Sequence, residues 1–172
     1  MNSIEFTFCR CGAEHLDTIC DIQEETFALL EDERLLRRNS REVLASCLEA
    51  PHVTMGVFCG QEMAAFGVLY RAGQSKDNLG TLLGLSGEAL ERTAAVKLTI
   101  VRPAYRGHGL QRKLISLLED EALALGIERL CATASPANIH SVRNFIAEGY
   151  DRCGRVTVYG GLERELFYKK LK

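Results

Sequence analysis

Two glycines separated by one residue, Gly107 and Gly109, are the residues whose spacing most clearly indicates chemistry. They end a loop at 102–109, which follows a stretch with strand composition and precedes a stretch with helical periodicity. Glycine permits a sharp turn, and the first amides of the following helix lack partners and carry the positive end of its dipole. Amides in this arrangement bind phosphate oxygens. Arg106 and Arg112 flank the turn and can add charge-assisted hydrogen bonds, so the pattern indicates an anion site.

The glycine pair alone does not separate a phosphate site from a plain strand-to-helix turn. A dinucleotide-binding fingerprint requires a third glycine at position 112, but that residue is Arg112. A P-loop requires Gly-Lys-Ser/Thr, and the loop contains no such triplet. These departures weigh against a nucleotide-binding module, and they leave the plain turn and the phosphate site open.

The elements around this loop predict an α/β domain with a mixed sheet of about six to seven strands flanked by helices. Strand patterns occur at 4–9, 53–59, 62–70, 94–101, 129–134, 152–159 and 165–171. Helical patterns occur at 13–30, 40–49, 86–92, 109–125 and 138–148, and 71–80 reads as a loop. Ser40 and Ser86 are predicted N-caps, and Gly126 and Gly149 are predicted helix stops.

The strand at 94–101 alternates apolar and polar side chains, which predicts a different environment for each face of the sheet. The residues expected on one face are Ala94, Val96, Leu98 and Ile100, and those expected on the other are Lys97 and Thr99. This strand leads directly into the glycine loop, so we expect it to lie beside the site.

Composition bounds the class of protein. The chain has 172 residues, of which 47% are hydrophobic and 26% charged, and this fits one globular domain spanning 1–172. A net charge of −2 argues against a surface that coats nucleic acid. The longest apolar run, at 63–70, is far shorter than the roughly 20 residues of a membrane helix. We therefore expect neither a nucleic-acid partner nor a membrane partner.

The seven cysteines are an odd number, and the start MNSIEFTF lacks the pattern of a signal peptide. These features predict a cytoplasmic protein with free, mostly buried thiols. Cys9 and Cys11 are expected to be a core-facing pair in a strand rather than zinc ligands, and no metal site is expected.

Two sequence blocks resemble the Gcn5-related N-acetyltransferases, the GNAT superfamily. The first is V-x-P-x-Y-R-G-x-G-L-Q at 101–111, and the second is N-x-x-S-x-x-x-F-x-x-x-G-Y at 138–150. One helix and one strand separate the blocks, as in that family, and the resemblance covers 94–150. It implies a domain that uses acetyl-CoA as co-substrate and needs no metal. Homodimers are common in the family, so a homodimer is one expected assembly.

The resemblance also implies how CoA is held. The amides of 107–111 would hold the pyrophosphate, and the backbone at Ile100 and Val101 would pair with the pantetheine arm where the central strand 94–101 splays from its neighbour. Asn138 would contact the arm from the other side, a role compatible with capping a helix. The implied cofactor-binding residues are Ile100, Val101, Arg106, Gly107, His108, Gly109, Leu110, Gln111, Arg112, Asn138, Ser141, Asn144 and Phe145.

The catalytic residues stay unassigned. The family's usual tyrosine acid is Phe145 here, and phenylalanine has no proton to donate. Ser141 and Tyr150 are alternative acids. The candidate bases are Glu24, Glu25, Glu62 and Glu91, although a surface charge is the better explanation for each of them. Water is another candidate for either role, and a thiolate is a good enough leaving group that an acid is not required.

The predicted function is direct transfer of an acetyl group to an amine of a small molecule or a peptide N-terminus, with a backbone amide of the central strand stabilising the oxyanion. The alternative is an acyl-CoA-binding sensor without transferase activity, which Phe145 and the lack of a strand carboxylate favour. By analogy with the family, acceptor specificity is expected in 20–40, 71–93 and 155–165. Acidic residues in 24–33 hint at a cationic amine, but a solvated helix face explains them better.

Overall fold

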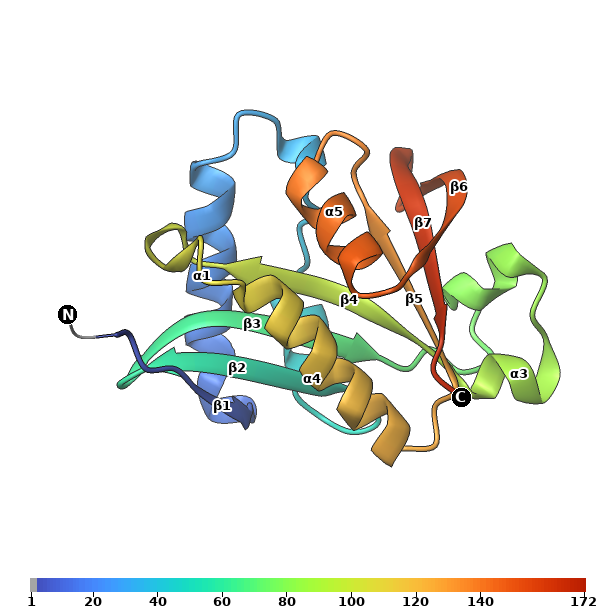
Figure 1. The fold of residues 1–172 in the computed structure, drawn as a ribbon, viewed down its shortest axis with the longest axis horizontal. Helices are drawn as coiled ribbons and strands as arrows, with labels where there is room; N and C mark the ends of the chain where they lie inside the picture. The colour runs from blue at the N-terminus through green and yellow to red at the C-terminus, as the bar shows by residue number, and fades with distance from the viewer. Residues whose placement is uncertain (1–2) are drawn as a thin grey trace.

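The computed structural model describes residues 3–172 as a seven-stranded sheet with helices on both faces (Figure 1). The strands are β1 (Thr7–Arg10), β2 (Val53–Cys59), β3 (Glu62–Tyr70), β4 (Thr93–Val101), β5 (Arg129–Ala134), β6 (Asp151–Val158) and β7 (Leu162–Lys170). The helices are α1 (Leu16–Ala28), α2 (Arg41–Cys47), α3 (Gly87–Glu91), α4 (Leu110–Ala124) and α5 (Ile139–Ala147). The strand order is β1-β2-β3-β4-β5-β7-β6, and among the described residues only β4 and β5 are parallel neighbours.

Helices α4 and α5 cover one face of the sheet, and α1 and α2 cover the other (Figure 1). The apolar side chains of α4 are buried on the first face, where Leu114, Ile115 and Leu118 are each 0% exposed. On the opposite face, Ile22 of α1 packs in a second cluster that includes Leu44 of α2. Because both faces are covered, the central strands are apolar on both sides.

The turn and cap residues explain most of the element boundaries. The hairpin of β2 and β3 turns at Gly60, and the predicted bounds of both strands are confirmed. The Ser40 hydroxyl accepts a hydrogen bond of 3.2 Å from the amide of Val43, as predicted for an N-cap. Gly126 and Gly149 follow α4 and α5 with positive φ angles of 80° and 88°, which confirms both as helix stops.

Several predicted boundaries were wrong. The first strand begins at Thr7 instead of residue 4, because its pairing with β2 starts there. Ser86 precedes α3 but its side chain makes no capping hydrogen bond. The predicted loop at 71–80 runs into a 3-10 helix at Leu79–Leu83. The last strand starts at Leu162 instead of 165, because its pairing with β6 already begins at Leu162, opposite Val158.

A β-bulge interrupts β4 in the middle of the sheet. Val68 of β3 pairs with Leu98, and the next residue, Leu69, pairs with Val96. Lys97 is therefore an extra residue with no partner in β3. A bulge of this kind shifts the side-chain alternation by one residue.

The bulge overturns the predicted faces of this strand. Ala94 and Val96 pack in the cluster beneath α4, whereas Leu98 and Ile100 pack in the cluster beneath α1 and α2. Lys97 and Thr99 are likewise not on one face. The Lys97 ammonium lies 4.4 Å from the centre of the Tyr70 ring, and Thr99 contacts α4. The alternating pattern was real, but the inserted residue could not be recognised from it.

Beyond the bulge, β4 and β5 separate. Their parallel pairing ends at Val96 and Ala132. From there, β4 continues to pair with β3 as far as Val101, and β5 continues to pair with β7 as far as Ala134. The backbone edges that face each other across this gap have no strand partner. The predicted splay at the central strand is thus confirmed.

The cysteines differ in part from the prediction. All seven are free, but only Cys11, Cys47 and Cys131 are buried, and Cys9 is exposed instead of facing the core. Burial raises the pKa of Cys11 and of Cys131 to about 12. Within 3–172 no three His, Cys, Asp or Glu side chains lie where they could hold a metal ion, and no helix there is long and apolar enough to cross a membrane.

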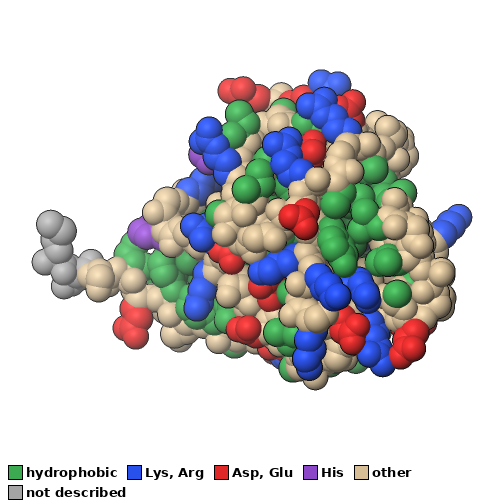
Figure 2. All heavy atoms as spheres, turned by 45° about the vertical axis from the view of Figure 1, so that its right-hand side comes forward, with side chains coloured by type: hydrophobic (Ala, Val, Ile, Leu, Met, Phe, Trp, Pro, Cys, Tyr) green, Lys and Arg blue, Asp and Glu red, His purple; other side chains and the backbone are tan. Residues whose placement is uncertain are grey.

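Surface charge is mixed on the face that Figure 2 turns forward. Lysine and arginine side chains there are interspersed with aspartate and glutamate. This arrangement matches a chain with 21 basic and 23 acidic residues.

Candidate active site

The glycine loop leads into α4 through two left-handed residues. Gly107 and Gly109 have φ angles of 83° and 69°, which L-residues with side chains adopt at a cost. A Cβ atom at either position would meet no atom within 4 Å, so the backbone conformation, and not lack of space, requires glycine. No side chain caps the start of α4. The first amides of this helix are therefore free to bind an anion.

The other end of the loop is tied to β3. The Arg102 amide donates to the Ala64 carbonyl at 2.9 Å, and the Arg102 guanidinium pairs with Glu62 at 2.9 Å and with Glu25 at 3.6 Å. The Tyr105 hydroxyl donates to Glu62, and this hydrogen bond raises the pKa of Tyr105 to about 12. These contacts hold the loop in place before any ligand arrives.

The two arginines and the histidine of the predicted anion site have different surroundings. Arg112 pairs at 2.8 Å with Glu148, the residue that follows α5, and this ion pair joins α4 to the end of α5. Arg106 is exposed and makes no ion pair with any described residue. His108 is exposed, and its ring lies 5.5 Å from that of Phe6 in an edge-to-face contact.

A polar network joins the first turn of α4 to α5 and to β4. The Gln111 Nε2 donates to the Thr99 Oγ1 at 3.0 Å and to the Ser141 Oγ at 2.7 Å. The Asn144 Nδ2 donates to the Gln111 Oε1 at 2.7 Å. Three residues predicted to bind the cofactor are thus brought together. Thr99 was not among the predicted residues, although it is a polar residue of the central strand.

Asn138 caps α5, as its sequence position allowed. Its side-chain Oδ1 accepts a hydrogen bond of 3.3 Å from the backbone amide of Ser141. Its backbone amide donates a hydrogen bond of 2.9 Å to the Ser135 carbonyl. Asn138 and Ser141 also line the cavity between β4 and β5. Capping and ligand contact are therefore geometrically compatible.

The cavity opens where β4 and β5 separate. Ten lining residues come from β4, from β5 and from the chain that runs from β5 into α5: Val96, Lys97, Leu98, Thr99, Thr133, Ala134, Ser135, Asn138, Ser141 and Phe145. The others come from the segment between α1 and α2 and from the β6–β7 hairpin: Leu35, Leu36, Arg37, Tyr159 and Arg164. No lining residue is acidic. The regions 20–40 and 155–165 thus reach the cavity, whereas no residue of 71–93 lines it.

Phe145 and Tyr150 form an aromatic group beneath α5. Phe145 is 3% exposed, and its ring lies 5.2 Å from each of the Tyr150 and Phe167 rings. Phe145 lines the cavity, but Tyr150 does not. The Tyr150 hydroxyl is buried without a hydrogen-bond partner among the described residues, and burial raises its pKa.

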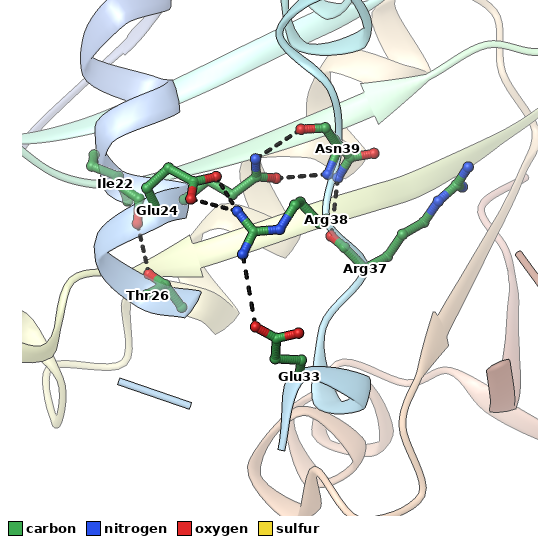
Figure 3. Close-up of polar contacts among 8 residues, drawn as sticks. Ile22, Glu24, Thr26, Glu33, Arg37, Arg38 and Asn39 are labelled. Carbon is green, nitrogen blue, oxygen red and sulfur yellow. Dashed lines mark hydrogen bonds and ion pairs between the residues drawn. The ribbon is translucent and has the colours of Figure 1, made fainter. Parts of the chain in front are cut away.

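Two of the candidate bases are held by arginines outside the cavity. Glu24 pairs with Arg38, as Figure 3 shows, and Glu25 pairs with Arg102. Both glutamates are exposed, and neither lines the cavity. Arg37, Tyr159 and Arg164 were not singled out from the sequence. Their only signal was membership in the two regions expected to contact the acceptor.

Comparison with known proteins agrees with this fold. The sequence model of the acetyltransferase (GNAT) family matches residues 16–149, well over half of the chain. The chain therefore belongs to the acetyltransferase (GNAT) family, as the two sequence blocks predicted. Among curated proteins, no sequence matches the chain.

Solved acetyltransferase structures share the whole architecture. The N-acetyltransferase of Staphylococcus aureus Mu50 is 16% identical with a TM-score of 0.75, over 98% of this chain and 99% of that one. The ribosomal-protein-S18-alanine N-acetyltransferase of Escherichia coli is 16% identical with a TM-score of 0.70, over 98% and 95%. Diaminobutyrate acetyltransferase EctA of Paenibacillus lautus, solved with L-2,4-diaminobutyric acid and coenzyme A, is 16% identical with a TM-score of 0.72, over 98% and 96%. At these identities the likeness establishes the fold.

Proposed function

We propose that this chain transfers the acetyl group of acetyl-CoA to an amine, on a small molecule or at a peptide N-terminus. One observation carries the proposal: the unpaired strand edges between β4 and β5 lie next to the uncapped start of α4. The first feature suits an extended amide-bearing arm, and the second suits a pyrophosphate. A single ligand with both parts fits the two features together.

The described residues fit CoA at each of these points. The amides of 107–111 and the exposed Arg106 would hold the phosphates. The backbone of Ile100 and Val101 pairs with β3 on one side and is open on the other, so it can pair with the pantetheine arm. The side chain of Asn138 lines the opposite wall. Bound there, acetyl-CoA supplies a thioester whose carbonyl carbon accepts a nucleophile.

The acceptor reacts as the neutral amine. Its nitrogen lone pair forms the C–N bond, the C–S bond breaks, and the bonding electrons leave with sulfur as the CoA thiolate. The proton that nitrogen loses passes to water. No carboxylate lines the cavity, but Lys97 and Arg164 do, and nearby cations favour the uncharged form of an amine. The chain therefore contributes by positioning the amine and by keeping it neutral.

Protonation of the CoA thiolate does not require an acidic side chain at position 145. Phe145 has no proton to give, and Tyr150 has a buried hydroxyl and does not line the cavity. Ser141 lies one helical turn before Phe145 and lines the cavity, so it is the α5 hydroxyl best placed to assist. A thiolate leaves readily without assistance, and water can protonate it afterwards.

Acetyl-CoA binding tests the donor site. Acetyl-CoA should raise the melting temperature of the wild type by mass action. Gly109→Val should abolish this shift, because valine cannot adopt the left-handed conformation at the start of α4. Gly84→Val is the matched control, because Gly84 is also left-handed, with φ of 76° and no atom within 4 Å of a Cβ, but lies far from the loop. No shift in the wild type would refute the donor site.

A sensor that binds acyl-CoA without transferring it is the second candidate. The absence of a side-chain acid at Phe145 and of any carboxylate along the cavity favours it. Release of free CoA thiol, measured over a broad amine panel, separates the two. The panel includes a peptide with an N-terminal alanine and also L-2,4-diaminobutyric acid. Alanine and L-2,4-diaminobutyric acid are named in the descriptions of two similar structures. Binding of acetyl-CoA with no amine-dependent thiol release would establish the sensor.

A further inference from the structure

Three basic side chains line the cavity, and no acidic side chain does. Arg37 comes from the segment between α1 and α2, Lys97 from the bulge of β4, and Arg164 from β7. None of them forms an ion pair with any residue in 3–172. The described part of the chain thus brings three basic residues to one cavity and gives none of them an ion-pair partner.

Of the three basic residues, Arg164 gives the strongest evidence for an anionic ligand, because it is only 4% exposed. Its Nη2 donates to the Arg34 carbonyl at 2.7 Å, and its Nη1 donates to the Glu163 carbonyl at 3.1 Å. These carbonyls orient the guanidinium but do not neutralise it, and burial lowers its pKa. A buried charge without a partner is costly to keep. A ligand anion in the cavity would offset that cost.

Arg37 packs on an aromatic ring that also lines the cavity. Its guanidinium carbon lies 4.1 Å from the centre of the Tyr159 ring, and the Tyr159 hydroxyl lies 3.0 Å from the Thr133 Oγ1. Figure 3 shows that Arg37 and its neighbour Arg38 point in opposite directions. Arg38 turns to Glu24 and Glu33, whereas Arg37 turns to the cavity. Adjacent arginines thus have separate roles.

Lys97 is the third basic residue that lines the cavity. The extra residue of the bulge places its ammonium 4.4 Å from the centre of the Tyr70 ring. Burial and, after it, the nearby Arg37 charge lower the pKa of Lys97, and Asp77, which does not line the cavity, acts in the opposite direction. An acceptor with a second positive charge would be repelled here. The acidic residues of 24–33 do not counter this repulsion, because none of them lines the cavity.

We infer that the acceptor amine also carries a carboxylate, which Arg37, Lys97 and Arg164 bind while the amine faces the thioester. This inference rests on the proposed acetyl transfer and names its substrate class: amino acids and other small amino carboxylates. A carboxylate on the acyl group of the donor is the other possible source of the same chemistry. The two sources predict different substrate preferences.

The test compares acceptors that differ only in the carboxylate. Thiol release from acetyl-CoA is measured with amino acids against their amides, and with γ-aminobutyrate against butylamine. Loss of a charge-assisted hydrogen bond lowers kcat/KM by about tenfold or more, so we expect the carboxylates to be preferred by that factor. Arg37→Gln and Lys97→Met should each reduce the preference to about threefold or less. Arg38→Gln is the matched control and should keep the full preference, because Arg38 lies outside the cavity.

Every other outcome contradicts the inference, and the outcomes can be told apart. Equal rates with acids and amides refute it and leave acetyl transfer standing. Faster reaction of succinyl-CoA than of acetyl-CoA with butylamine, dependent on Arg37, assigns the cations to the acyl group instead. If no amine reacts although acetyl-CoA binds, the proposed function fails. Calorimetry with N-acetyl amino acids and their amides on the CoA-loaded protein then decides, and equal affinities would refute the anion site itself.

Discussion

Gln111, at the start of α4, donates a hydrogen bond of 2.7 Å to the hydroxyl of Ser141 on α5, 30 residues further along the chain. The same amide nitrogen reaches Thr99 on β4, and its carbonyl oxygen accepts from Asn144. One side chain thus links the strand that splays, the helix that would receive the pyrophosphate and the helix that forms the opposite wall. Together with the Arg112–Glu148 ion pair, it ties α4 to α5.

Replacement of Gln111 by alanine should destabilise the protein by about 1–3 kcal/mol, because three part-buried polar groups lose their partner. Urea denaturation measures the change. Arg112→Gln is the control, because the exposed ion pair that it removes contributes about 1 kcal/mol or less. Equal effects of the two substitutions would show that the network adds no more than a surface contact.

Phe145→Tyr tests whether leaving-group protonation limits the reaction. We expect kcat to change by less than about tenfold, because a thiolate with a pKa near 8.5 leaves without full protonation. Phe145→Leu is the comparison, since it removes the ring and adds no hydroxyl. Steady-state kinetics at saturating acetyl-CoA provides kcat for both variants. A rise of about a hundredfold in the tyrosine variant alone would mean that the wild type lacks an acid that it needs.

Gly67→Ala should weaken the contact between α4 and the sheet. A Cβ on this β3 residue would lie 3.2 Å from the Leu118 Cδ1 and 3.3 Å from the Thr99 Cγ2, so both neighbours would have to shift. Overpacking of this kind costs about 1–3 kcal/mol. Thermal denaturation measures the loss, and acetyl-CoA binding should weaken with it because Thr99 contacts Gln111. An unchanged melting temperature would show that α4 can move away from β3 at no cost, which would contradict the prediction.

Buried thiols should make the protein less stable in alkali. The pKa of Cys11 and of Cys131 rises from 9.0 to about 12 on folding. The folded state therefore holds these protons more tightly, so stability is complete below pH 9 and falls as the pH rises towards 12. The expected slope is about 1.4 kcal/mol per pH unit for each thiol.

Denaturation at about pH 8 and about pH 10.5 checks this slope. The double variant Cys11→Ala, Cys131→Ala should lose less stability between these two pH values than the wild type does. Cys9→Ala is the control, because that thiol is exposed. An identical alkaline loss in wild type and double variant would contradict the assignment of the slope to these thiols.

Local sequence determined much of this protein. Glycine at 107 and 109 specified the left-handed turn into α4, because few other residues adopt that conformation. Asn138 specified the start of α5 through its own capping hydrogen bond, and the leucine spacing of α4 specified its buried face. These features depend on residues a few positions apart, so their physical causes are visible in the sequence. Two such blocks were enough to predict the family and the fold.

Only the tertiary structure decided where β4 changes faces and what the cavity contains. The bulge at Lys97 depends on its register with β3, and the alternation of the strand looks the same with or without it. Arg164 meets the Arg34 carbonyl across 130 residues of chain, and Arg37 meets Tyr159 from another element. Contacts of this kind arise from packing between distant segments, and no local pattern encodes them. The glycine loop and the start of α5 were therefore predictable from the sequence, and the group of cations that lines the cavity was not.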